Sequence, residues 1–118
     1  MHIDFKLYLI TDRHQCAPGH TLVSAVDAAL RGGVKAVQLR EKDLNPAQLL
    51  EYAQRLRILT QAYGAKLLIN DRADIAVAAE ADGVQLTEHS MDIRSARKVL
   101  GRVTVTMTTT TKPNFVAL

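Results

Sequence analysis

Short β-prone runs alternate with amphipathic helical segments along most of this chain, and this alternation constrains its fold more than any other feature. It is typical of β-strand–helix–β-strand units, whose strands lie parallel in one sheet. The hydrophobic share of 47% and the charged share of 23% are those of an ordinary globular protein. Five strands are predicted, at Leu7–Thr11, Ala36–Arg40, Lys66–Asn70, Gly83–Leu86 and Val103–Thr108. The fold class is therefore α/β, built from parallel (β/α) units.

Helix start and stop signals lie between these strands. Thr21 is placed to cap a first helix, and Asn45 with Pro46 begins a second, which Gly64 ends. Two more helices are predicted, at Ala73–Ala81 and Asp92–Leu100. The chain thus contains four (β/α) units and a fifth strand, in a domain at residues 1–107. The pattern is lost afterwards, so residues 108–118 are predicted to form an irregular tail.

Length and composition exclude several classes of protein. The chain has 118 residues, enough for one domain but not for a complete (β/α)8 barrel of about 250 residues. Cys16 is the only cysteine, which excludes an intrachain disulfide and agrees with a reducing, cytoplasmic location. We find neither a signal-peptide pattern nor an apolar run of about 20 residues, so the sequence does not predict a membrane protein. Aromatic residues make up only 4%, too few for nucleic-acid stacking, so a small anionic ligand best explains the net charge of +3.

Three polar clusters lie where predicted strands end. They are Thr11–Arg13, Gln38–Asp43 and Asn70–Arg72. Because the carboxyl ends of parallel strands lie on one rim of the sheet, we expect these residues to converge there. Cations, amides and carboxylates in one pocket suit a phosphorylated or diphosphorylated substrate with a divalent metal.

Each cluster also has a simpler explanation. Arg40 and Lys42 can belong to a solvated loop, and Asn70 and Asp71 can cap the third helix. Two further pairs have structural alternatives: Arg72 with Asp74 as a surface ion pair, and Asp12 with Arg13 as a strand end and turn.

Four motifs resemble the thiamine-phosphate synthase family, which includes the related thiazole tautomerase. They are Tyr8-Leu9-Ile10-Thr11-Asp12, Gln38-Leu39-Arg40-Glu41-Lys42-Asp43, Leu68-Ile69-Asn70-Asp71-Arg72-Ala73-Asp74-Ile75-Ala76 and Ala81-Asp82-Gly83-Val84-Gln85-Leu86. Their order and spacing cover nearly all of residues 6–101. The resemblance implies about half of a TIM barrel and a role in thiamine biosynthesis. The implied enzyme is a transferase that joins a pyrimidine diphosphate to a thiazole phosphate and releases diphosphate.

The resemblance also implies roles for individual residues. Gln38 would hydrogen-bond the pyrimidine, while Arg40 and Lys42 would hold the diphosphate and stabilise the charge that develops as it leaves. Asn70 would also contact the diphosphate, and Asp71 would bind Mg²⁺ as the implied cofactor. The expected partners are small phosphorylated substrates, with no nucleic acid and no membrane.

The chain departs from the family pattern in three places. Ser90 stands where the synthase has its second magnesium carboxylate, a form shared with the tautomerase branch. No histidine follows His89, although the tautomerase needs one for proton transfer. Strands six to eight are missing, and the Thr-rich end favours truncation or a frameshift over a natural half-barrel. We therefore expect impaired turnover, and a homo-oligomer that covers the open strand edges.

A flavodoxin-like signalling receiver is the alternative from a different class of protein. Its size is similar, and Asp12, Asp71, Thr87 and Lys112 follow that fold's order of acid, phospho-acceptor, hydroxyl and lysine. This alternative leaves the Gln38–Asp43 cluster without a role.

Overall fold

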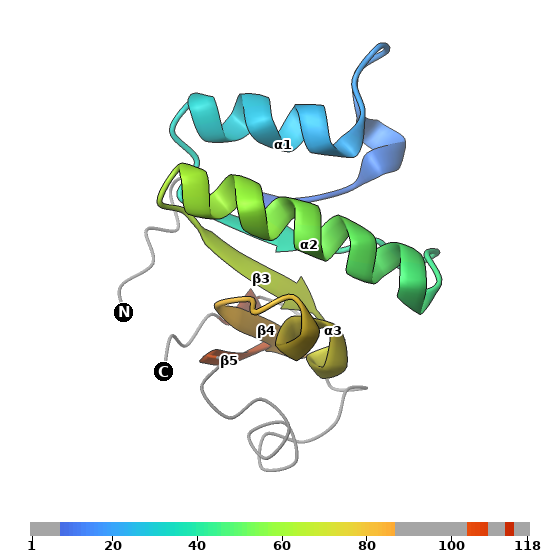
Figure 1. Cartoon of the computed structure of the whole chain (residues 1–118), viewed down its shortest axis with the longest axis vertical. Coiled ribbons are helices and arrows are strands. Elements are labelled where there is room, and N and C mark those ends of the chain that lie inside the picture. The colour runs from blue at the N-terminus through green and yellow to red at the C-terminus, as the bar shows by residue number, and fades with distance from the viewer. Residues whose placement is uncertain (1–7, 87–103, 109–112, 115–118) are drawn as a thin grey trace.

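The computed structural model describes residues 8–86, 104–108 and 113–114, which form one sheet with helices packed on it (Figure 1). Consecutive strands are neighbours, in the order β1-β2-β3-β4-β5-β6. The first five run parallel, and β6 pairs antiparallel with β5. Their bounds are β1 (Tyr8–Ile10), β2 (Ala36–Leu39), β3 (Lys66–Asn70), β4 (Gly83–Leu86), β5 (Thr104–Thr108) and β6 (Pro113–Asn114). The predicted parallel α/β architecture is confirmed. In the segment expected to be an irregular tail, Pro113–Asn114 is a short strand.

The strand order separates the two candidate folds. A flavodoxin-like sheet has the order 2-1-3-4-5, whereas strands of a (β/α) barrel follow one another around the sheet. Here β1 pairs with β2, with Ile10 opposite Gln38, and β2 pairs with β3, with Gln38 opposite Leu68. The flavodoxin-like alternative is therefore wrong, because it needs β1 between β2 and β3.

In the described part of the chain, three α-helices and one short 3-10 helix connect the strands. They are η2 (Arg13–Gln15), α1 (Leu22–Arg31), α2 (Pro46–Ala62) and α3 (Ala73–Ala78). The predicted caps are confirmed, since the side chains of Thr21 and Asn45 accept hydrogen bonds from backbone amides in the first turns of α1 and α2. The helix predicted at Asp92–Leu100 lies outside the described residues. None of the helices in the described part of the chain is long and apolar enough to span a membrane.

The helix α3 is shorter than predicted because it ends at a left-handed residue. Glu80 has a φ of 56°, and its N–H donates to the carbonyl of Val77 while that of Ala81 donates to Ala76. These two bonds form a Schellman motif, which usually places glycine at the left-handed position. The sequence has Glu80 there, so it shows no stop signal before Ala81.

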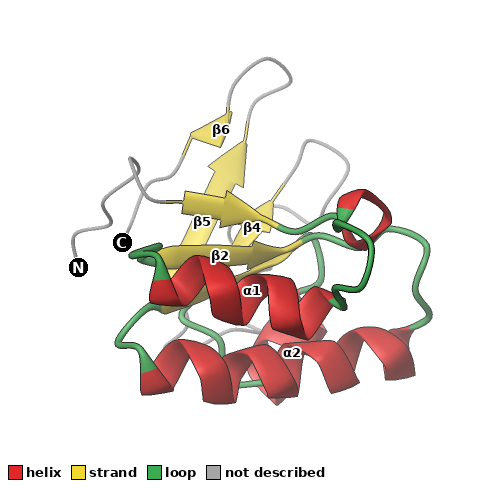
Figure 2. Cartoon of the chain, turned by 90° about the horizontal axis from the view of Figure 1, so that it is seen from above, coloured by secondary structure: helices red, strands yellow, loops and turns green. Residues whose placement is uncertain are grey.

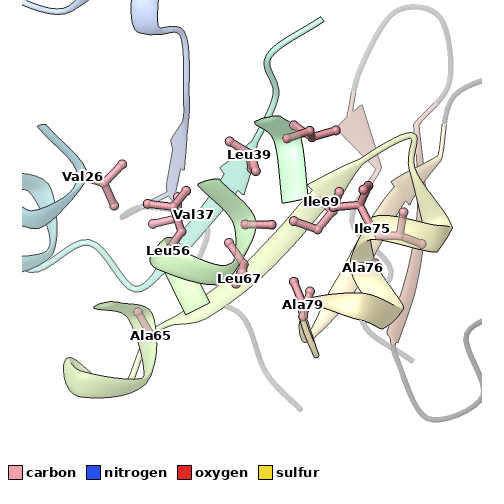
Figure 3. Packing of buried hydrophobic residues seen from close by; sticks show 14 of the residues in the cluster. Val26, Val37, Leu39, Leu56, Ala65, Leu67, Ile69, Ile75, Ala76 and Ala79 are labelled. Atoms are coloured by element: carbon pink, nitrogen blue, oxygen red, sulfur yellow. The ribbon is translucent and has the colours of Figure 1, made fainter. Parts of the chain in front are cut away.

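The hydrophobic core lies between the sheet and the helices. Figure 2 shows α1 and α2 on one face of the sheet, and Figure 3 shows the packing between the two layers. Alternate strand residues point into this core, because successive side chains of a strand face opposite sides. They are Val37 and Leu39 of β2, Leu67 and Ile69 of β3, and Val84 and Leu86 of β4. The strand residues that alternate with them belong to the opposite face. Gln38 and Asn70 are among these, so the fold places polar groups on the face away from α1 and α2.

Candidate functional site

Polar side chains from three neighbouring strands are linked on the face of the sheet opposite α1 and α2. The Asn70 amide nitrogen of β3 donates to Gln38 Oε1 of β2 over 2.9 Å, and Gln38 Nε2 donates to the Tyr8 hydroxyl of β1. Gln38 is buried, with 2% of its surface exposed. Burial also raises the pKa of Tyr8 well above its usual range, so its hydroxyl stays protonated at neutral pH. The structure thus brings Gln38 and Asn70 together and fixes the orientation of the Gln38 amide.

The two predicted cations follow β2 directly and open onto two adjacent cavities. Arg40 and Lys42 are both exposed, whereas Glu41 between them is buried. A cavity of about 400 Å³ is lined by Leu39, Glu41, Lys42, Leu44, Leu49, Asn70, Asp71 and Arg72. A second, of about 340 Å³, is lined by Thr11, Asp12, His14, Arg40, Glu41, Lys42 and Asp43. Gln38 lines neither of these two cavities. Lys42 lines both, and therefore connects Arg40 with Asn70 and Asp71.

Asp71 occupies a tight turn at the end of β3. Its φ is 67°, in the left-handed region that aspartate tolerates better than most residues. Its N–H donates to the Gln85 carbonyl over 2.7 Å, and the N–H of Arg72 donates back to the Asn70 carbonyl over 2.7 Å. This turn places Asp71 at the wall of the larger cavity. The N-cap of α3 is Arg72, not Asn70 or Asp71.

The other two structural alternatives are also settled by hydrogen bonds. Arg72 and Asp74 form the predicted surface ion pair, with Nη2 and Oδ2 2.7 Å apart. Asp12 opens a turn, because its carboxylate caps η2 by accepting from the His14 N–H over 3.1 Å. Arg13 donates two hydrogen bonds to the Asp43 carboxylate, at 2.6 and 2.8 Å, and so has a structural partner as well.

A buried carboxylate at this rim was not predicted from the sequence. Glu41 accepts hydrogen bonds from the Thr11 hydroxyl at 2.7 Å, and from the backbone N–H and guanidinium of Arg13 at 3.0 Å each. The sequence around Glu41 could have indicated its burial, because neighbouring side chains at the end of a strand point to opposite sides. Glu41 accordingly turns its carboxylate to Thr11 and Arg13, although it also lines both cavities.

Replacing Asp43 with asparagine should lower stability at neutral pH, and this loss should become smaller as the pH falls below the unfolded pKa of the carboxyl. The Arg13 guanidinium, followed by His14, holds the pKa of Asp43 well below its usual range. A carboxyl whose folded-state pKa is lowered contributes stability above its unfolded pKa of about 3.9, and loses it as the pH falls toward the folded value. Urea denaturation of both proteins at pH 7 and about pH 3.5 measures this. A stability difference that grows in acid would contradict the pairing.

The single carboxylate of Asp71 fits a Mg²⁺ ion that is coordinated mainly by the oxygens of a bound phosphate compound and by water. The described residues contain no cluster of three or more His, Cys, Asp or Glu side chains able to hold a metal ion. Mg²⁺ commonly takes one or two carboxylates and completes its shell with phosphates and water. Asp71, on the cavity wall beside Lys42 and Asn70, provides one such carboxylate. Ser90 and the nearby carboxylates Glu88 and Asp92 lie outside the described residues.

Comparison with known proteins identifies the family. The family described as "Thiamine monophosphate synthase" matches residues 7–117. The chain belongs to this family. A putative thiamine-phosphate synthase of Geobacter sulfurreducens is 60% identical over 99 residues, which are 84% of this chain and 46% of that protein. The thiamine-phosphate synthase of Clostridium novyi is 46% identical over 101 residues, 86% of this chain and 49% of that protein.

A solved structure supports the same family and the fold. The thiamine phosphate pyrophosphorylase of Pyrococcus furiosus superposes with a TM-score of 0.78 at 36% identity, over 85% of this chain and 48% of that one. The fold is therefore that of part of a TIM-barrel-like thiamine monophosphate synthase, as the sequence predicts. The chain spans about half the length of the curated relatives it matches.

Proposed function

We propose that this chain carries the pyrimidine diphosphate half of a thiamine-phosphate synthase site, and so belongs to thiamine biosynthesis. The observation that supports this most is one cavity lined by Lys42, Asn70 and Asp71, with Arg40 on the adjoining one. The proposed reaction joins hydroxymethylpyrimidine diphosphate to thiazole phosphate. The bond between the pyrimidinylmethyl carbon and the diphosphate oxygen breaks, its electron pair leaves with that oxygen, and the thiazole nitrogen bonds to the carbon.

In this proposal the residues of the chain bind and orient the diphosphate. Arg40 and Lys42 neutralise the charge that develops on the departing oxygens, Arg40 as a planar fork and Lys42 as a point charge. The Asn70 amide has a second N–H beyond the one given to Gln38, and donates it to a diphosphate oxygen. Gln38 is held between Tyr8 and Asn70 and lines neither cavity, so its contact with the pyrimidine rests on the family resemblance. Mg²⁺, when bound, adds charge neutralisation at the same oxygens, and Asp71 would hold it.

Replacing Asp71 with asparagine tests the metal role. The variant should bind inorganic diphosphate at least about tenfold more weakly in the presence of Mg²⁺, because a neutral amide is a poorer Mg²⁺ ligand. Without Mg²⁺, the two proteins should bind diphosphate within about twofold of each other. Calorimetric titration with and without the metal measures both. Equal affinities in Mg²⁺ would show that Asp71 does not hold it.

The tautomerase-like branch is the second candidate function, since Ser90 matches its pattern better than that of a synthase. The two candidates differ in chemistry, because a tautomerase exchanges a proton of a thiazole carboxylate phosphate without condensation. Solvent-isotope exchange on that compound, with no product joined to a pyrimidine, would favour the tautomerase side.

We also propose that a second copy of this chain packs against the open edge of the sheet. In the described sheet β1 stands at one end of the strand order, and Ile10 on it is 41% exposed. The end of a sheet that carries an exposed apolar side chain is a common place for another chain to associate. Sedimentation velocity should therefore show a dimer or larger species that dissociates on dilution. A monomer across a wide concentration range would contradict this.

A further inference from the structure

We propose that Glu41 is a positioning residue that, through Thr11, holds Arg40 and Lys42 in place for an anionic diphosphate ligand. The inference rests on the proposed function. Glu41 is an unexpected residue for an anion site, because its negative charge lies between the two cations expected to bind the ligand. Its side chain is only 1% exposed, and burial of a charge is costly unless hydrogen bonds and an opposite charge compensate it.

Among the described residues, the compensation comes from the end of β1 and the turn after it. Glu41 Oε2 accepts from the Thr11 hydroxyl, and Oε1 accepts from the backbone and side chain of Arg13. The loop after β2 is thereby tied to the neighbouring strand by three hydrogen bonds. The Arg13 guanidinium pairs with Asp43 as well as with Glu41, so it joins both carboxylates of this loop to the turn after β1.

Thr11 completes the connection, because its hydroxyl contacts the loop twice. It donates to Glu41 and also accepts the backbone N–H of Arg40 over 2.9 Å. The Thr11 N–H in turn donates to the Gln38 carbonyl, which continues the pairing of β1 with β2. With the Glu41 carboxylate and the Arg40 backbone both held by Thr11, the segment that carries Arg40 and Lys42 is fixed beside the cavities that these side chains line.

The direction in which the affinity for diphosphate changes when Glu41 loses its charge distinguishes a positioning role from a purely electrostatic one. Replacing Glu41 with glutamine removes a negative charge close to the proposed anion. If Glu41 acted only through its charge, inorganic diphosphate with Mg²⁺ would bind this variant more tightly. If Glu41 positions the loop, the E41Q variant binds about tenfold more weakly, because the amide group disturbs the three hydrogen bonds and small displacements of binding groups are costly.

Thr11 provides a second test with matched controls. Thr11→Val removes the hydroxyl at nearly constant size, and should weaken diphosphate binding by about tenfold. Thr11→Ser keeps the hydroxyl and should restore affinity to within about twofold. Thr60→Val removes another buried hydroxyl, one that donates to the Arg57 carbonyl within α2, and should leave the affinity unchanged. Amide hydrogen exchange at Arg40 should be faster in the Thr11→Val protein and unchanged in the Thr60→Val protein.

The outcomes separate this inference from the proposed function. Failure of the unaltered chain to bind Mg²⁺-diphosphate would overturn the proposed function, and the inference with it. If the unaltered chain binds, but the Glu41→Gln and Thr11→Val variants bind as tightly or more tightly, only the positioning role is overturned. If Thr11→Val does not fold, the direction of the change in Glu41→Gln decides alone.

Discussion

Replacing Arg40 and Lys42 together with alanine should weaken Mg²⁺-dependent binding of inorganic diphosphate by at least about 100-fold. A hydrogen bond to a charged group contributes about 1.5–3 kcal/mol, so the two side chains together contribute about 3–6 kcal/mol. At about 1.4 kcal/mol for each factor of ten, this corresponds to a loss of about 100-fold or more. Both side chains are exposed, so the substitutions should leave the fold intact. Titration calorimetry at constant ionic strength measures the effect.

Arg31→Ala is the control for this double variant. Arg31 is an exposed cation in the last turn of α1, paired with Asp27 over 2.8 Å, and it lines neither cavity at the strand ends. Its loss should change the affinity for diphosphate by less than about twofold, because Arg31 lies outside both cavities. The fold should also be kept, because a surface ion pair contributes little to stability. Similar losses in both proteins would show that diphosphate responds to net charge alone. A double variant that binds within about threefold of the unaltered chain would exclude Arg40 and Lys42 from the site.

The second large effect is expected for Leu56→Ala, which should lower the free energy of unfolding by about 2–5 kcal/mol. Leu56 of α2 is completely buried and belongs to the same core cluster as Val37 of β2 (Figure 3). The substitution removes apolar contacts and leaves a cavity that the sheet and helices cannot fill. A loss of this size is a large part of the about 5–15 kcal/mol that stabilises a typical domain. Urea denaturation followed by circular dichroism measures it.

Ile58 is the matched control, because it lies on the same helix and is 70% exposed. Ile58→Ala should change stability by no more than about 0.5 kcal/mol, as is usual for surface positions. Equal losses in the two variants would mean that α2 does not pack against the sheet through Leu56.

Most of the fold could be predicted from local patterns. The caps at Thr21 and Asn45 and the strand at Lys66–Asn70 were predicted as the structure has them, because each depends on residues close together in the sequence. The end of α3 could not be predicted, because Glu80 adopts a left-handed conformation that usually belongs to glycine. Strand order also needed the structure, since it excluded the flavodoxin-like alternative.

The candidate site was only half predictable. Its convergence at strand ends follows from the parallel sheet, which brings Lys42 near Asn70 and Asp71. The contacts of Glu41 with Thr11 and Arg13 depend on the pairing register of β1 with β2, in which Ile10 lies opposite Gln38. That register joins residues about 30 positions apart, and no local pattern determines it.

Titration of this chain with hydroxymethylpyrimidine diphosphate, with and without Mg²⁺, tests the central claim most directly. If the ends of β2 and β3 form the pyrimidine diphosphate half of a synthase site, the compound should bind saturably and much more tightly with Mg²⁺. Addition of thiazole phosphate should yield negligible product with this chain alone. Absence of saturable binding in Mg²⁺, or turnover close to that of a full-length relative, would contradict the account.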